Sequence, residues 1–307
     1  MRYDFFQLND LLSQKLQSGE PFSCLRIDNT AGYVMDCLYK GELPSKEFYN
    51  ENTLVEGGVY PNIMEYAYNT VIPMTHAAMK KCDILGFVDM SESIARNTQF
   101  VSEFGEKPNF FGHNDMLIMD PGALLNVTGH HYVKTPWPTY LKGKKVLVIS
   151  THAETIQHQW NNIDKIWGDK KDSIVPFDLV GIIKSPYHPA MDARQYPGCD
   201  TWDKTVDYIM QEIRQYDFDV LLTSSTTSSP IYAVLAAEMG KVGIQTGGVL
   251  QLWFGILGYR WSVEANNGYK PWATMYNEHW MYPLEQDEPA NRNKYAFLET
   301  NYAYWKR

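Results

Sequence analysis

Residues 217–248 read DFDVLLTSSTTSSPIYAVLAAEMGKVGIQTGG, and this stretch decides the expected fold. The apolar run at 219–224 predicts one strand, and VGIQT at 242–246 predicts another. Pro230 suits the first turn of a helix and Gly240 suits a carboxyl-terminal cap, so the segment between the strands predicts a helix. This order is typical of two parallel strands joined by a crossover helix.

The same alternation extends upstream to Lys144. VLVIS at 146–150 and DLVGII at 178–183 predict two further strands. A helix is expected after each strand, with apolar residues at helical spacing, namely Ile156, Trp160, Ile163 and Trp167 in the first and Trp202, Val206, Ile209 and Ile213 in the second. We therefore expect an α/β, Rossmann-like fold whose mostly parallel sheet carries helices on both faces.

The amino-terminal part is less regular. An apolar stripe that begins at Phe5 and stops at Gly19 predicts a helix, and residues 22–27 predict a strand. The remaining expected elements are helices at 32–39 and 63–79 and a strand at 84–88, with long loops and short elements over 103–140. The 307 residues contain no internal repeat and no low-complexity linker, so we expect a single domain, with the alternative of a seam within 136–144.

Composition excludes several classes of protein. A net charge of -9 without Lys or Arg clusters argues against a nucleic-acid-binding surface. No apolar run is long enough to span a membrane and the first residues are polar, so we expect a soluble, cytoplasmic protein. The four cysteines lack CxxC spacing, which favours reduced thiols with packing roles: Cys24, Cys37, Cys82 and Cys199.

Ligands of open parallel sheets bind outside the carboxyl ends of the strands, so the candidate residues are those that follow each strand. These are residues 26–30, 150–154, 184–185, 224–229 and 246–251. Ser224, Ser225 and Thr226 could hold a phosphate through hydroxyl and N–H groups, or could form a solvated, helix-capping loop. Gly247 and Gly248 would let a diphosphate approach the backbone, or could simply form a tight turn.

Four charged or titratable residues at this edge could each have either a functional or a structural role. Arg26 could bind a donor phosphate or pair with a carboxylate. Asp28 could act as a base or metal ligand, or bond its own backbone in a turn. His152 could transfer a proton or be a structural histidine, and Glu154 could favour the start of its helix.

Other motifs carry little weight. Asn126 begins a glycosylation acceptor pattern without a secretory signal, and His130 and His131 lack identifiable further metal ligands. No GxGxxG, Walker, GxSxG or HExxH motif occurs, so nicotinamide-dependent, kinase, hydrolase and zinc protease readings have no support.

The segment from Pro136 to Pro283 resembles bacterial GT-D-type glycosyltransferases and their polysaccharide-associated relatives. Its most specific part runs from Gly247 through Gln251, Phe254, Gly255 and Arg260 to Trp261. PFSCLRIDNTAG resembles the family pattern in which a strand ending in Arg leads to an Asp-x-Glu pair. The resemblance implies a Rossmann-like fold, a UDP-sugar donor held by residues that include Asn29 and Gln251, and a divalent ion, Mn²⁺ or Mg²⁺, at the acidic pair.

Asn29 and Ala31 occupy the positions that match the two acids, and Asp28 is the acid that is left. Either Asp28 takes over the metal, or Arg26 and backbone groups neutralise the diphosphate, or catalysis is lost. We expect a glycosyltransferase that moves a sugar from a nucleotide-sugar donor to a glycan hydroxyl, with Asp28 and then His152 as candidate bases. The alternatives are a non-catalytic nucleotide- or glycan-binding module and a methyl-transferring Rossmann enzyme.

Overall fold

The computed structural model describes most of the carboxyl-terminal half of the chain and several segments before it. The described residues are 2–27 except 4, then 37, 40–42, 58–87 except 62, 98–104, 107, 109–111, 135–186, 196–262, 275–288 and 304–305. Within these ranges no helix is both long enough and apolar enough to cross a membrane.

Eight strands form one sheet, and every pairing between them is parallel. They are β1 (Arg2–Tyr3), β2 (Phe22–Ile27), β3 (Ile84–Phe87), β4 (Asn109–Phe111), β5 (Lys145–Ser150), β6 (Asp178–Lys184), β7 (Val220–Ser224) and β8 (Val242–Gln245). Their order across the sheet is β1-β4-β3-β2-β8-β7-β5-β6. The expected Rossmann-like α/β architecture is confirmed, with a sheet that is parallel throughout its described strands.

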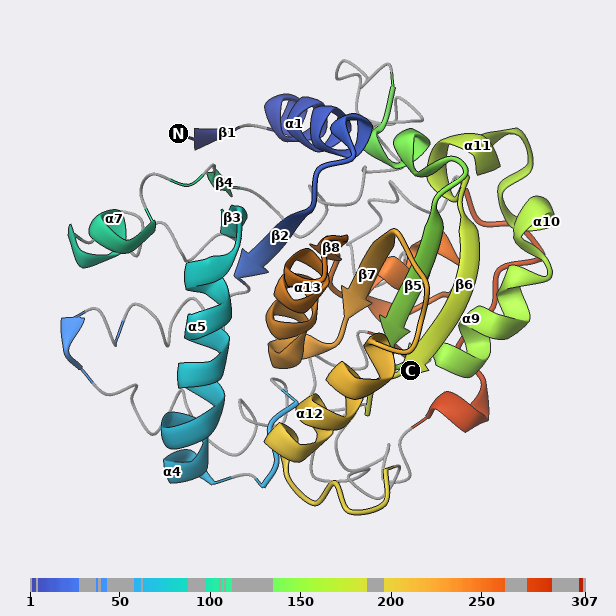
Figure 1. The fold of residues 1–307 in the computed structure, drawn as a ribbon. Helices are drawn as coiled ribbons and strands as arrows, with labels where there is room; N and C mark the ends of the chain where they lie inside the picture. The colour runs from blue at the N-terminus through green and yellow to red at the C-terminus, as the bar shows by residue number, and fades with distance from the viewer. Residues whose placement is uncertain are drawn as a thin grey trace.

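Helices cover both faces of this sheet (Figure 1). The α-helices are α1 (Phe5–Ser18), α4 (Met64–Tyr66), α5 (Ile72–Lys81), α7 (Thr98–Phe104), α9 (Ala153–Trp160), α10 (Ile163–Trp167), α11 (Lys171–Ile174), α12 (Trp202–Ile213), α13 (Ser229–Glu238) and α14 (Leu250–Trp253). Short 3-10 helices occur at η4 (Trp137–Leu141), η5 (Gly168–Lys170), η8 (Thr226–Ser228), η9 (Tyr259–Trp261) and η10 (Glu285–Asp287), and η1 (Ala67–Val71) is π-helical.

Alternate side chains of β5 enter two separate cores. Val146 and Val148 join a cluster that includes residues of α1, α10 and α14, whereas Leu147 and Ile149 join one that includes residues of α12 and α13. Successive strand residues point to opposite faces, so a strand buried on both sides is apolar without alternation. That requirement explains the continuous VLVIS run.

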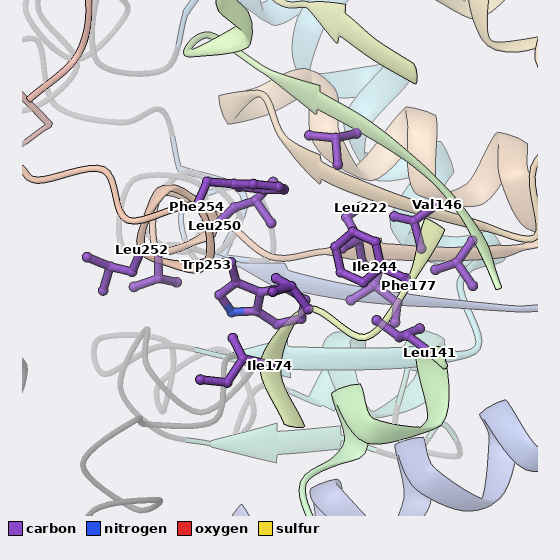
Figure 2. Packing of buried hydrophobic residues seen from close by; sticks show 14 of the residues in the cluster. Leu141, Val146, Ile174, Phe177, Leu222, Ile244, Leu250, Leu252, Trp253 and Phe254 are labelled. Carbon is purple, nitrogen blue, oxygen red and sulfur yellow. The ribbon is translucent and has the colours of Figure 1, made fainter. Parts of the chain in front are cut away.

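Large aromatic side chains fill the first of these cores (Figure 2). Trp253 lies 5.5 Å from Trp137 between ring centroids, and its carbonyl accepts a 2.7 Å hydrogen bond from the indole of Trp167. These contacts attach α14, the short helix after β8, to η4 before β5 and to α10 after it. All four cysteines are buried and free, as packing residues would be.

The structure differs from the sequence-based expectation in the length of some elements. The helix expected through Ile156 and Trp167 is two helices, because the chain breaks at Asn161 and Asn162, and Asn is a poor helix former. The helix expected over 63–79 contains the π-helical turn η1. β1 and β4, with two and three residues, are too short to show a periodicity in the sequence. The helix expected at 32–39 lies outside the described residues, apart from residue 37.

The strand order creates a switch point beside β5. β5 pairs with β6 on one side and with β7 on the other. The chain runs outward from β5 to β6 and then returns past β5 to β7, so the direction of the connections reverses between β5 and β7. In open α/β sheets the crevice for ligands lies at the carboxyl ends of strands at such a point. Because β2 pairs with β8, both halves of the chain contribute strands to this sheet. The expectation of a single domain stays a prediction.

Candidate functional site

The serine-rich loop after β7 bonds largely to itself. The Ser229 hydroxyl accepts a 2.6 Å hydrogen bond from the Ser225 backbone N–H, and Ser228 Oγ donates to the Ser225 carbonyl at 2.6 Å. The buried Ser225 hydroxyl also meets the hydroxyls of Ser228 and Ser185. These contacts favour the loop-forming role for Ser225. Of the three predicted phosphate-binding residues, they leave the half-buried Ser224 and the exposed Thr226 as those that can meet a ligand.

Thr226 has an unusual backbone conformation. Its φ angle is 44°, in the left-handed region that few residues other than glycine adopt. Its side chain also lies against Gly58, where an added Cβ would collide with Thr226 Oγ1. A strained residue of this kind persists only where its surroundings hold it, and such residues concentrate at ligand sites.

The structure brings Arg26 and Gly247 together across the edge of the sheet. Arg26 is buried near the end of β2, and its backbone N–H donates to the Gln245 side chain at 3.1 Å. Gly247 follows β8 with φ of 69°, and a Cβ atom there would collide with Arg26 Nη1. Only glycine supplies both the backbone conformation and the space for the guanidinium. The two residues therefore form one structural unit.

His152 lies two residues after the end of β5 and is buried at the start of α9. Its Nδ1 lies 3.3 Å from the Thr151 hydroxyl, and its ring lies 4.9 Å from that of Trp305 between centroids. Among the described residues, no partner reaches Nε2 of His152. Burial lowers the pKa of His152 to about 4, the charge of Asp287 opposes this shift, and Lys184 adds to it. The ring is therefore neutral at pH 7, and its Nε2 is buried without a hydrogen-bond partner among the described residues.

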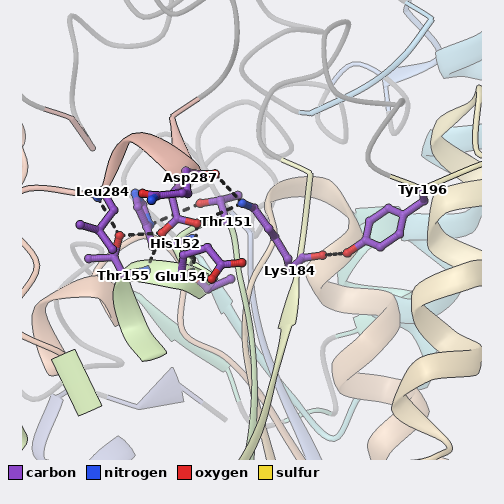
Figure 3. A network of polar contacts seen from close by, with 10 residues as sticks. Thr151, His152, Glu154, Thr155, Lys184, Tyr196, Leu284 and Asp287 are labelled. Atoms are coloured by element: carbon purple, nitrogen blue, oxygen red, sulfur yellow. Dashed lines mark hydrogen bonds and ion pairs between the residues drawn. The ribbon is translucent and has the colours of Figure 1, made fainter. Parts of the chain in front are cut away.

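Asp287 holds the beginning of α9 (Figure 3). Its carboxylate accepts hydrogen bonds from the backbone N–H of Glu154 at 3.1 Å, the N–H of Thr155 at 2.7 Å and the Thr155 hydroxyl at 2.6 Å. Lys184 lies 3.2 Å away, and its side chain is 22% exposed whereas that of Asp287 is 0% exposed. A buried carboxylate needs such partners, and the positive end of a helix supplies them.

The other predicted residues fall into two groups. Gln251 is buried and donates to the Ile256 carbonyl at 3.3 Å, which favours a structural role. Gly248 lies beside Gly247 and packs against the Tyr304 ring. Asp28 and Asn29 follow the last residue of β2 in the sequence and lie outside the described residues. His130 and His131 also lie outside them.

Sequence patterns did not indicate three residues of the site: Asp287, Tyr304 and Trp305. Asp287 bonds to Thr155 across 132 positions of the chain, and Trp305 reaches His152 from the last described segment. No local pattern marks a residue that acts at such a separation. An alignment of relatives in which these positions vary together would have been the usable signal.

We predict that His152 makes stability depend on pH. Its folded pKa lies below the unfolded value of 6.5, so the neutral form is favoured by folding, and this contribution is lost as the pH falls from 6.5 towards about 4. Between about pH 7.5 and about pH 5, the wild type should lose about 2 kcal/mol of unfolding free energy relative to His152→Asn. Urea denaturation at both pH values measures this difference.

The matched control for this prediction is His158→Asn, which removes an exposed imidazole from the same helix. That variant should follow the wild type at both pH values. A constant stability difference between the wild type and His152→Asn would contradict a neutral, buried ring.

Comparison with known proteins adds no family to this description. No family model matches the chain, and neither the curated proteins nor the solved structures yield a match.

Proposed function

We propose that this protein is a GT-D-type glycosyltransferase that moves a sugar from a nucleotide-sugar donor, a UDP-sugar, to a glycan hydroxyl. The observation that carries the proposal is the packing of the buried Arg26 guanidinium on Gly247 at the carboxyl edge of a parallel sheet. A cation beside a glycine turn at this place suits a diphosphate, because the backbone can approach the phosphate closely and the guanidinium matches its oxygens.

The neighbouring groups fit the rest of such a ligand. Ser150 and Ser224 are opposite each other in the register of β5 and β7, at the switch point of the sheet. Thr226 extends from the loop after β7 and is exposed. Hydroxyl groups in these positions can donate to phosphate or sugar oxygens. His152 supplies a neutral imidazole after β5, and no described residue bonds to its Nε2.

The chemistry needs a base and a stabilised leaving group. The acceptor oxygen attacks the anomeric carbon, the bond from that carbon to the diphosphate oxygen breaks, and the hydroxyl proton passes to a base. We assign Asp28 as the first candidate base and His152 as the second. Arg26 would stabilise the charge that develops on the departing diphosphate.

A divalent ion has no identified set of ligands. Among the described residues, no group of three or more His, Cys, Asp or Glu side chains could hold a metal ion. Mn²⁺ or Mg²⁺ at Asp28 stays a prediction, and the steps above use only side chains of the protein.

The second candidate function is a non-catalytic nucleotide- or glycan-binding module. Asn29 and Ala31 stand at the positions where GT-D-type glycosyltransferases have their acidic pair, and this difference favours a binding module. Such a module would keep the Arg26 and Gly247 unit and bind a donor without turnover.

Arg26→Ala should weaken the binding of UDP by about 2 kcal/mol, or about 30-fold in Kd, because a charge-assisted contact to phosphate is lost. Arg26→Lys should give an intermediate Kd, because it keeps the charge but not the fork geometry. Isothermal titration measures all three proteins. Arg214→Ala, which removes an exposed arginine at the end of α12, is the control and should bind as the wild type does.

A pair of glycine variants distinguishes displacement of the Arg26 guanidinium from backbone strain as the cause of weaker UDP binding. Gly143 and Gly247 both have positive φ angles, 73° and 69°, but only an alanine at Gly247 would displace Arg26. Gly247→Ala should therefore weaken UDP binding more than Gly143→Ala. Unchanged UDP affinity in folded Arg26→Ala and Gly247→Ala would assign Arg26 a structural role.

Asp28→Asn distinguishes the two candidate functions, a glycosyltransferase and a non-catalytic binding module. If Asp28 is the base, the variant should keep its donor affinity and lose roughly 100-fold in turnover, the usual scale for a general base. The assay follows release of UDP together with glycosylated product over a panel of acceptors. Full transferase activity in Asp28→Asn would move the base to His152 or Glu154, whereas a wild type without turnover supports the module.

A further inference from the structure

The segment Tyr304–Trp305, here called the strap, lies on the candidate site. Trp305 is fully buried, packs its ring on that of His152, and accepts a 3.0 Å hydrogen bond from the Tyr259 N–H through its carbonyl. The aromatic ring that packs on His152 therefore comes from a distant part of the sequence.

Tyr304 fills the space that the second glycine leaves. A Cβ atom at Gly248 would collide with the Tyr304 ring, so this ring takes up the close approach to the backbone that Gly248 allows. Its hydroxyl accepts a 3.4 Å hydrogen bond from Arg260 Nη1, and its ring lies 5.9 Å from that of Trp261. The turn that we assign to the donor is thus already in contact with an aromatic ring of the same chain.

The covered histidine would gain from an opening of the strap. A buried polar atom without a hydrogen-bond partner is costly, and no described residue reaches Nε2 of His152. Moving Trp305 away would uncover the face of the His152 ring on which it packs. Tyr304 is half-buried, so its release costs less apolar burial than the release of the fully buried Trp305, and Tyr304 is the anchor that a substitution can loosen first.

We propose that the strap is an autoinhibitory element: Tyr304 and Trp305 occupy the ligand site, and they must leave Gly248 and His152 before the donor binds. The identity of the ligand rests on the proposed function, whereas the covering of His152 does not. If a ligand binds only when the strap has left the site, its apparent affinity is reduced by the free energy of opening. A variant that favours the open state therefore binds the ligand more tightly.

The first test is the rate at which diethylpyrocarbonate modifies His152, followed by peptide mass spectrometry. The reagent attacks neutral imidazole, and His152 is neutral at pH 7, so its rate reports the covering and not the charge. Tyr304→Ala should raise the rate at His152 by about tenfold, because the loss of one anchor shifts the strap towards the open state. The exposed His158 on the same helix is the internal reference and should react equally in all proteins.

Two further variants serve as controls. Tyr304→Phe keeps the ring on Gly248 and should stay close to the slow wild-type rate. Tyr140→Ala removes another half-buried tyrosine, in η4 before β5, and should leave the rate at His152 unchanged. Equal rates of His152 modification in the wild type and in Tyr304→Ala would overturn the proposal that the strap covers this residue.

The second test is UDP binding to the same proteins by isothermal titration. Tyr304→Ala should bind UDP about tenfold more tightly than the wild type does, in line with the gain in the open state. Weaker or equal binding by Tyr304→Ala would overturn the proposed autoinhibition. If neither protein binds UDP while His152 reacts faster in Tyr304→Ala, the strap is supported and the proposed donor fails.

Discussion

Parallel pairing of the strands is the constraint on which the rest of this structure depends. Each strand runs in the same direction, so every connection must return over a face of the sheet, and every strand ends at the same edge. The register of the strands shows this alignment: Ser150 is opposite Ser224, and Thr223 is opposite Gln245. Residues that are distant in the sequence thereby become neighbours at one edge. Arg26 and Gly247 meet for the same reason, because β2 pairs with β8.

The polar groups at this edge are held by partners from outside the sheet. Asp287 provides a charge at the start of α9 and meets Lys184 at the end of β6, so two neighbouring strand ends are linked through one carboxylate. The same carboxylate and Lys184 act in opposite directions on the pKa of His152, where burial is the largest influence. The neutral state of this ring therefore follows from its burial and does not require a dedicated charged partner.

Sequence patterns identified β2, β3, β5, β6, β7 and β8, because each is a short, largely apolar run bounded by turn residues. They also indicated the edge at which Arg26, His152 and Gly247 lie. They did not separate α9 from α10, because Ile156, Trp160, Ile163 and Trp167 keep one helical spacing across the break. Nor did they show that the hydroxyls of Ser225 and Ser228 bond to each other. The roles of Asp287 and Trp305 depend on contacts between distant segments, which local propensity does not encode.

The central claim is that the carboxyl edge of the sheet binds a nucleoside diphosphate, and hydrogen–deuterium exchange with and without saturating UDP tests it most directly. Binding slows exchange where backbone groups are ordered or covered. The account predicts protection by UDP in peptides that cover residues 22–27, 150–155, 224–229 and 246–251, and no change in those that cover α1 and η4 at the other end of the strands. Protection confined to other segments, or none at saturating UDP, would contradict the claim.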